Sequence, residues 1–330
     1  MFKIRTSVAA ALAGVAAFGM AIAAPATAQD KFPSEPVIIQ VPFAPGGGAD
    51  RTFRLFAPYL SKELGVPVKV TNVAGGGGWV SWSQVVNWDG EADDHKLAVV
   101  NIPHVFSMLN PEMKRTETLE SFNFVAWHSY DPGLWLTRWD DDRFQNLNDL
   151  LEYAKKTPLV IAVGNHGSDD HVGIAYAMRA VPALKDSKLI FSDTGDNGKI
   201  QMLLGKSADL VTGNVGYYIN GIMERQMRPM AVLHDEPWIL LPSVPTFQEV
   251  TGKPNITYAG RTLAAANGLS EKKKEIYLAA IEKAMSNPEY VQKELGNRNF
   301  LMFRKGEEMW KLLRAGQQVA QEAAYWEAAK

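Results

Sequence analysis

A strand-like run that leads through a glycine-rich loop into an amphipathic segment constrains the fold of this chain more than any other feature. The run Val37–Val41 is apolar and β-branched, and Pro42 ends it. The loop Ala44–Asp50 contains three consecutive glycines. The segment from Arg51 to Leu64 then repeats apolar residues at helical spacing, at Phe53, Phe56, Leu60 and Leu64. A strand, a tight loop and a helix in this order are typical of α/β proteins with a mainly parallel sheet.

The same alternation recurs along the rest of the chain. Short apolar runs predict strands over residues 66–70, 97–100, 159–163, 189–191, 208–211 and 230–233. Helical spacing predicts helices over residues 79–86, 149–156, 171–180 and 199–204, and a helical tail over residues 271–285, 288–295 and 306–326. The pattern pauses near residues 124–127 and resumes at 134–136. At about 150 residues per domain, the length of 330 residues predicts two α/β lobes followed by the helical tail.

Composition excludes several classes of protein. The chain has 9 Trp, 10 Tyr and 14 Phe, which are too many aromatic residues for a disordered chain. Its formal net charge of −2 lacks the basic excess that a general nucleic-acid binder needs. There is no cysteine, so disulfides, thiolate zinc sites, iron–sulfur clusters and cysteine nucleophiles are all excluded.

The first 28 residues have the pattern of an export signal. Lys3 and Arg5 form a positive start, residues 7–24 are small or apolar, and Ala26-Thr27-Ala28 matches a signal-peptidase site. We therefore expect a signal peptide at residues 1–28 and a mature chain that begins near Gln29. Its removal takes away two basic residues and no acidic one, so the net charge becomes −4. The alternative is an N-terminal membrane anchor, although no later segment approaches the ~18 uninterrupted apolar residues of a spanning helix.

The loop 44–50 has the chemistry of an anion site. Backbone N–H groups at a helix N-terminus point outward, and glycine lets an anion approach them closely. A P-loop is excluded because the terminal Gly-Lys-Ser/Thr is missing, and the dinucleotide fingerprint is excluded because Arg51 stands at its last glycine position. The spacing alone leaves two interpretations open, a carboxylate-binding loop and a purely structural turn.

Four motifs resemble the substrate-binding proteins of tripartite tricarboxylate transporters, the Bug family. The first is Val41-Pro42-Phe43-Ala44-Pro45-Gly46-Gly47-Gly48-Ala49-Asp50, with Arg54 four residues on. The second is the segment 68–78, which ends in four glycines, and the third is the helical segment 146–158. The fourth is Leu241-Pro242-Ser243-Val244-Pro245-Thr246-Phe247-Gln248-Glu249. They occur in the family's order and cover essentially the whole mature chain, which is a far more specific signal than one motif.

The resemblance implies a two-lobe periplasmic binding protein of the type II-like class. Each lobe would be a mixed, mainly parallel sheet flanked by helices, with the ligand in the interlobe cleft. Chain crossings near residues 125–131 and 230–234 would place residues 29–128 and 234–330 in lobe 1 and residues 129–233 in lobe 2.

The function implied by the resemblance is the capture of a small carboxylate in the periplasm. The receptor would hand its ligand to membrane transporter subunits, would act as a monomer, and would need neither catalysis, cofactor nor metal. Two other functions remain open: an exported hydrolase that uses the same cleft, and a subunit that presents its ligand to a membrane sensor.

The resemblance also assigns ligand contacts by position. On the first lobe they are Ala44, Pro45, Gly46, Gly47, Asp50, Gly76, Gly77 and Gly78. On the opposite wall they are Asn165, His166, Ser168, Asp193 and Thr194. We add Trp79, because it directly follows Gly78 at a helix start that we expect to face the cleft, where it could stack on a ligand or cover a cation. The alternative for Trp79 is packing in the core.

Departures from the family pattern concentrate on the opposite wall. Asn165-His166-Gly167-Ser168 replaces a Gly-x-Gly-Ser/Thr loop, and Asp193 stands where a tyrosine is usual. Asp169 and Asp170 add negative charge nearby. Because unpaired aspartates repel a second carboxylate, we expect a monocarboxylate whose far end is neutral, hydroxylated or cationic. The alternative is that these aspartates face solvent or cap helices.

Two clusters suggest other chemistry. Asp93-Asp94-His95 and Asp169-Asp170-His171 contain metal-ligating residue types, but adjacent side chains point in different directions and seldom share a metal. Ser168 and His171 could form a hydrolase pair, yet the chain has no G-x-S-x-G elbow. We therefore expect neither a metal site nor a catalytic residue.

Overall fold

Strands and helices alternate in the computed structural model, which describes residues 31–164, 166–192 and 194–327. The predicted signal peptide, residues 1–28, lies outside the described residues, and Phe32–Lys330 form one unit. The strands are β1 (Val37–Val41), β2 (Val68–Asn72), β3 (Lys96–Ile102), β4 (Asn123–Arg138), β5 (Val160–Val163), β6 (Lys188–Phe191), β7 (Leu210–Asn214), β8 (Met227–Leu233), β9 (Tyr258–Ala265) and β10 (Leu301–Arg304). The helices are α1 (Gly48–Leu64), α2 (Trp79–Val85), α3 (Leu147–Ala154), α4 (Asp169–Ala180), α5 (Gly195–Leu204), α6 (Val215–Met223), α7 (Phe247–Thr251), α8 (Glu271–Met285), α9 (Pro288–Gly296) and α10 (Gly306–Ala323).

The strands follow the order β2-β1-β3-β9-β4-β7-β5-β6, and β8 and β10 also pair with β4. Pairing is parallel at both ends of this order, between β1 and its neighbours β2 and β3, and between β5 and its neighbours β6 and β7. Pairing is antiparallel in the middle, where β9 lies between β3 and β4. Two parallel groups are thus joined by long antiparallel strands.

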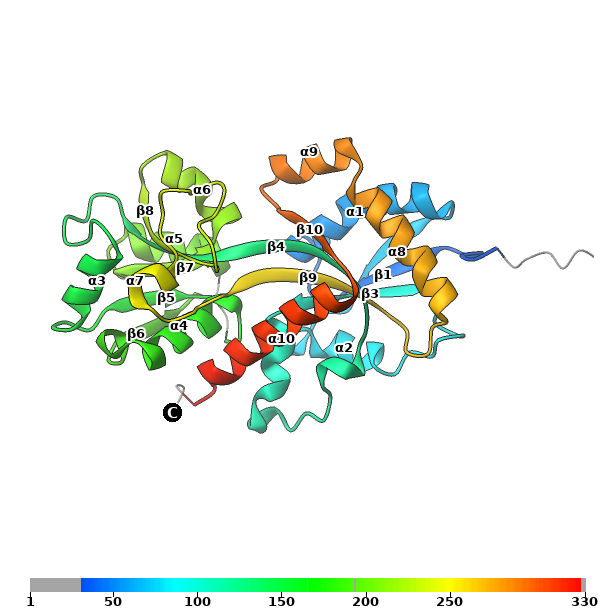
Figure 1. Ribbon diagram of the computed structural model, residues 1–330, viewed down its shortest axis with the longest axis horizontal. Coiled ribbons are helices and arrows are strands. Elements are labelled where there is room, and N and C mark those ends of the chain that lie inside the picture. Colours follow the sequence, from blue (N-terminus) through cyan, green and yellow to red (C-terminus); the bar gives the residue numbers. More distant parts are fainter. Residues whose placement is uncertain (1–30, 165, 193, 328–330) are drawn as a thin grey trace, which may run out of the picture. The chain divides into compact units, whose positions relative to one another are not determined.

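Strand β4 belongs to both groups (Figure 1). Its residues 123–132 pair with β9, and its residues 133–138 pair with β7 and β8. The sequence predicted a pause near residues 124–127, and that prediction was wrong because the strand runs without interruption for 16 residues. Nearly every residue of β4 is buried, so the strand lacks the alternation of apolar and polar residues that marks a half-exposed strand.

Each group of strands has a hydrophobic core on both faces. In the first group, one core packs α1 and α8 against the sheet through Phe53, Phe56 and Tyr277. The other core contains Trp82 and Trp127 together with residues of α2 and α10. In the second group, α3 and α4 cover one face and α5 and α6 cover the other. Helices on both faces make this an α/β architecture of three layers.

Two segments contact strands outside the lobe that the expected boundaries assign to them. Phe247 of α7 packs with Trp135 in a core of the second group, and the chain pairs with strands of the first group at β9. Helix α10 packs against α4 of the second group (Figure 1). The division into lobes at residues 128 and 234 stays a prediction, and these contacts tie the tail to both groups.

Candidate functional site

A polar cavity of about 370 Å³ lies where the first glycine loop enters α1. It opens beside the strands that join the two groups, at the carboxyl end of β3, which is the usual place for ligands in open α/β sheets. Residues from both groups line it: Gly48, Arg51, Thr52, Asp131, Asp196, Asn214, Gly216, Tyr217, Ala259, Arg261, Glu294, Asn297, Arg298 and Asn299.

Arg261, whose guanidinium is buried, is one of three arginines that line the cavity, the others being Arg51 and Arg298. It lies on β9 opposite Ser129 of β4, and its Nη1 donates to Ser129 Oγ and to Asn299 Oδ1, both at 3.2 Å. Its buried Nε has no partner among the described residues. Asp131, Glu294 and Asp169 act on it only through longer-range attraction, and burial lowers the pKa of its guanidinium. Arg261 therefore keeps hydrogen-bond donors and charge for a ligand.

Arg261 also contacts the first turn of α1. A Cβ atom placed on Gly48 would lie 3.1 Å from Nη2 of Arg261, so the guanidinium packs closely against the start of the helix. The N–H groups of a first helical turn have no partner within the helix, and the helix dipole favours negative charge there. A guanidinium and a helix N-terminus at one end of a cavity form a site for an anion.

Asp131 lies in the same cavity with the opposite charge. Both its carboxylate oxygens accept from the N–H of Gly216, at 3.0 and 3.2 Å. Burial raises the pKa of Asp131 to about 8, against the opposing effects of the Gly216 hydrogen bond and of Arg261. Because the described residues offer no hydrogen-bonded cation to this carboxyl group, a negative charge on it would be uncompensated at close range, and burial favours the neutral form.

The first glycine loop is fixed by Asp50. Its Oδ2 accepts from Gly46 N at 2.8 Å, its Oδ1 accepts from Asn72 Nδ2 at 2.8 Å, and Arg54 donates to both oxygens at 2.9 Å. The hydrogen bond from Arg54 is the main reason that the pKa of Asp50 falls to about 2, and Gly46 and Asn72 add to it. Asp50 is 2% exposed, so in this structure it holds the loop in place from beneath.

On the other side of the cavity, Lys199 balances the charge of the neighbouring aspartates Asp170 and Asp196. Asp196 accepts from Lys199 Nζ at 2.8 Å, and Lys199 is also paired with Asp170 and donates to Thr212 O at 2.7 Å. Burial works to lower the pKa of Lys199, but the attraction of Asp170 and Asp196 outweighs it and raises the pKa. Asp169 accepts from Asn214 Nδ2 at 2.6 Å.

One interpretation of the sequence was that Asp169 and Asp170 face open solvent. The structure shows that they do not. Each is 7% exposed, and both lie in the first turn of α4.

The predicted contacts of the first loop lie next to the cavity. Ala44, Pro45 and Gly46 are exposed, Gly47 is half-buried at the N-cap of α1, and the cavity itself begins one residue later, at Gly48. The motif thus locates the site, but the residues that line the cavity come from the helix that follows it.

In the second glycine loop, Gly78 is needed for packing against Trp82. Gly78 has a φ of +106°, and a Cβ there would lie 2.6–2.8 Å from the ring of Trp82. Gly76 and Gly77 are exposed.

Trp79 is not at a cleft surface, because it is 1% exposed and its Nε1 donates to Ser107 Oγ at 2.7 Å. The expected stacking wall is therefore corrected to a core tryptophan, which packs edge-on against Trp82 and carries the Arg115 guanidinium on its face.

The predicted opposite wall is described in part. Asn165 and Asp193 lie outside the described residues. His166 is exposed and stacks on Phe191, with ring centroids 3.9 Å apart, and Thr194 is exposed at the N-cap of α5. Ser168 is buried and caps α4 by accepting from His171 N at 3.3 Å. None of these three is among the residues that line the cavity.

Sequence reasoning missed two of the charged residues that line the cavity. Arg261 lies in a segment, Tyr258–Ala265, that was not predicted as a strand, and Asp131 lies in the predicted pause. A charged residue inside a long buried strand is unusual, and Asp131 in β4 was the available signal. The pairing of β4 with β9, which brings the two residues together, has no local sequence signature.

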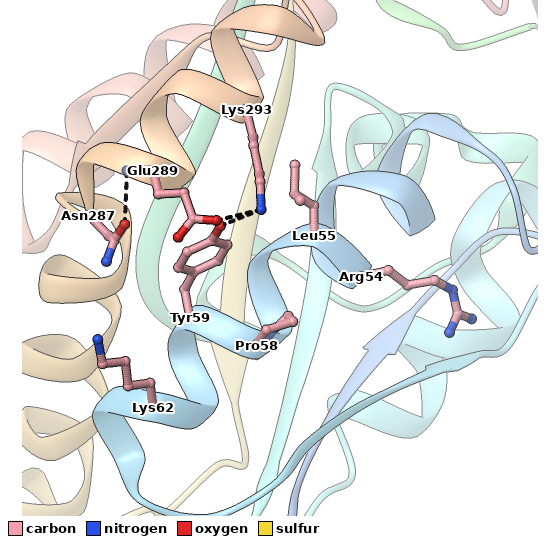
Figure 2. A pocket seen from close by; sticks show the side chains of 8 residues that line it. All are labelled: Arg54, Leu55, Pro58, Tyr59, Lys62, Asn287, Glu289 and Lys293. Carbon is pink, nitrogen blue, oxygen red and sulfur yellow. Dashed lines mark hydrogen bonds and ion pairs between the residues drawn. The ribbon is translucent and has the colours of Figure 1, made fainter.

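Another cavity, of about 350 Å³, lies on the outer surface between α1 and α9 (Figure 2). It is lined in part by basic side chains, but Lys293 donates to Glu289 at 2.7 Å and to Tyr59 OH at 3.0 Å, and Arg54 is paired with Asp50. Since protein groups meet these two positive charges, this cavity is a weaker candidate for an anion.

The described residues provide no cluster of three or more His, Asp or Glu side chains that could hold a metal ion. Over the same part of the chain, no helix is both long enough and apolar enough to cross a membrane.

Comparison with known proteins identifies the family. The profile of the Tripartite tricarboxylate transporter family receptor matches residues 52–321. The chain belongs to this family. The resemblance drawn from the four motifs is thus confirmed, and the tricarboxylate transporter receptor described here is one of the family's solute-binding proteins.

Individual relatives agree with this assignment. The receptor is 26% identical over 290 residues to the UPF0065 protein in the tcbD-tcbE intergenic region of Pseudomonas sp. strain P51, which covers 86% of this chain and 84% of that one. Its fold is similar to that of a TctC solute binding protein from Polaromonas, with a TM-score of 0.76, 22% identity and coverage of 88% and 98%. It is also similar to MatC from Rhodopseudomonas palustris with bound malate, with a TM-score of 0.65, 22% identity and coverage of 90% and 99%. The receptor therefore has the two-lobe fold of periplasmic binding proteins, as the sequence predicted.

Proposed function

We propose that this receptor captures a small monocarboxylate in the periplasm for a tripartite tricarboxylate-type uptake system, by reversible binding and without catalysis. The observation that carries the proposal is Arg261, a guanidinium without a hydrogen-bonded acidic partner among the described residues, in a cavity that opens at the start of α1. The malate bound to MatC supports a carboxylate as the class of ligand.

The chemistry of this end of the cavity suits one carboxylate. Two N–H groups of a guanidinium can face both oxygens of a carboxylate at once, and hydrogen bonds to charged groups contribute about 1.5–3 kcal/mol each. That range corresponds to roughly a tenfold to 150-fold gain in affinity. The exposed backbone of Ala44–Gly46 and the half-buried Gly47 would complete the anion site, as the family resemblance suggests.

The acids elsewhere in the cavity favour a single carboxylate. Asp131 lines it without a cationic partner among the described residues, and the sequence adds Asp193 on the proposed opposite wall, whereas Asp196 is balanced by Lys199. At ~4 Å and an effective dielectric constant of about 20, a second carboxylate would meet a repulsion of about 4 kcal/mol, which is several hundredfold in affinity. We propose that Ser168, His166 and Thr194 approach the ligand when the two groups of strands close on it.

Titration calorimetry with the purified mature protein tests the proposal. The panel contains mono-, di- and tricarboxylates, each beside its uncharged amide, and a thermal-shift screen first selects the members that bind. We expect at least one monocarboxylate to bind while its amide does not. Arg261→Gln should weaken that binding at least tenfold.

Arg304→Gln is the matched control, because Arg304 is exposed on β10, away from the cavity. It should leave the affinity within twofold. The proposal fails if no carboxylate binds, if Arg261→Gln binds as well as the unmodified protein, or if the protein hydrolyses members of an ester and amide panel.

A further inference from the structure

We infer that the ligand is a zwitterion, a small monocarboxylate that also carries an ammonium group, and that Asp131 is the residue that recognises the ammonium. This inference rests on the proposed function, because it assumes that Arg261 holds the carboxylate. The juxtaposition that carries it is a guanidinium and a carboxyl group on one face of the sheet, each without a hydrogen-bonded partner of opposite charge among the residues that the structure describes.

The strand register places the two charges. Ser129 pairs with Arg261 and Asp131 pairs with Ala259, so Arg261 and Asp131 are diagonal neighbours on adjacent strands. Side chains two residues apart on a strand share a face, and diagonal neighbours are about 7–8 Å apart. The Nη1 of Arg261 donates to the Ser129 hydroxyl, which confirms that the guanidinium lies on the face shared by Ser129 and Asp131.

The two groups nevertheless turn to different partners. The guanidinium extends to Asn299 and to the start of α1, whereas the carboxyl group of Asp131 accepts from Gly216 at the start of α6. They attract each other only over a longer range. A molecule with one negative and one positive end fits between them, since its carboxylate would meet Arg261 and its ammonium would meet Asp131.

The other two acids of the cavity differ from Asp131 in different ways. Asp196 is paired with Lys199 and accepts from Tyr218 OH at 3.0 Å. Glu294 is 1% exposed; its Oε2 accepts from Asn299 Nδ2 at 2.9 Å and its buried Oε1 has no partner among the described residues, but it lies on α9 and not on the sheet face that carries Arg261 and Asp131. Within the described residues the carboxyl group of Asp131 accepts only from the backbone N–H of Gly216, and its burial favours the neutral form until a cation arrives. An ammonium donates up to three hydrogen bonds and would remove that cost.

Two matched series of ligands test the inference by calorimetry. The longer series is 4-aminobutyrate, 4-hydroxybutyrate, pentanoate and glutarate, and the shorter is alanine, lactate, isobutyrate and methylmalonate. Within each series the carboxylate is constant, and the other end is an ammonium, a hydroxyl, a methyl or a second carboxylate. We expect the ammonium member of one series to bind at least tenfold more tightly than its methyl analogue.

Asp131→Asn should lower the affinity for the ammonium member at least tenfold and change that for the hydroxyl and methyl members less than threefold. Asparagine keeps an oxygen that accepts from Gly216, so the variant should fold, and circular dichroism checks this. Asp196→Asn is the matched control, because Asp196 lines the same cavity but is balanced by Lys199. It should change every affinity less than threefold.

The outcomes separate this inference from the proposed function. If carboxylates bind but the ammonium member has no advantage over the methyl analogue, or if Asp131→Asn weakens all members alike, the inference is wrong and the proposed function stands. If neither these compounds nor the broader carboxylate panel bind, both are wrong. The comparison of ammonium with methyl uses the unmodified protein, so it holds whether or not a variant folds.

Discussion

Replacement of Asp50 by alanine is expected to destabilise the protein and to weaken ligand binding together. The carboxylate joins Gly46, Asn72 and Arg54, and its side chain is 3% exposed. Its pKa falls from 3.8 to about 2, which at 1.36 kcal/mol per pH unit corresponds to about 2.4 kcal/mol. Because Arg54 is half exposed, solvent screening reduces this value, and we expect a loss of about 1–2 kcal/mol.

Differential scanning calorimetry measures the loss. For a folded unit of this size, about 1–2 kcal/mol corresponds to a fall in Tm of roughly 2–3 °C. Affinity for the best carboxylate should fall in the same variant, since the N–H of Gly46 loses the acceptor that fixes the loop at the cavity. Glu308→Ala is the matched control. Arg304 and Glu308 have the same i, i+4 spacing as Asp50 and Arg54, but both are exposed and their closest charged atoms are 3.6 Å from each other. The reasoning is refuted if Asp50→Ala lowers the Tm no more than Glu308→Ala does.

Three further predictions concern the glycine loops and pH. The folded state depresses the pKa of Asp50, so the stability difference between the unmodified protein and Asp50→Asn should be complete above about pH 5 and disappear between about pH 4 and 2, as urea titrations across this range would measure. Gly78→Ala should cost more than about 3 kcal/mol in urea unfolding, because its Cβ would overlap the ring of Trp82 at a φ of +106°, whereas Gly77→Ala, which meets open space at a φ of +64°, should cost about 1 kcal/mol. Gly47→Val should abolish ligand binding in calorimetry, because the side chain would block the approach of an anion to the backbone. Circular dichroism should stay normal, since the added Cβ makes only an ordinary van der Waals contact at a φ of −70°. Unchanged affinity would remove Gly47 from the site.

The sequence predicted the elements whose signals are local. The run Val37–Val41 is a strand as predicted, and the amphipathic segment after the glycine loop is a helix that begins three residues earlier than predicted, at Gly48. Strand β9 was missed because its sequence mixes small, polar and charged residues, and its place in the sheet depends on two neighbours that are far away in the chain. Tertiary pairing decides such segments more than intrinsic preference does.

The site could be predicted only as far as its motif reached. The glycine loop led to the start of α1, which is one wall of the cavity. Arg261 and Asp131 could not be paired from sequence, because 130 residues separate them and their shared face follows from the register of β4 with β9. The prediction for Trp79 was wrong for a different reason. A side chain at a helix start can point either to the surface or into the core, and contacts with Trp82, Phe122 and Ser107 hold the Trp79 ring in the core.

Because the long strand β4 pairs with strands of both groups, the two groups depend on each other for stability. A cut anywhere along its 16 residues would leave a broken ladder on either side, with unpaired backbone groups that invite aggregation. The tail adds to this, since α10 shares a core with both α2 and α4. We therefore expect that a gene fragment encoding only one group of strands would not fold into a stable protein on its own.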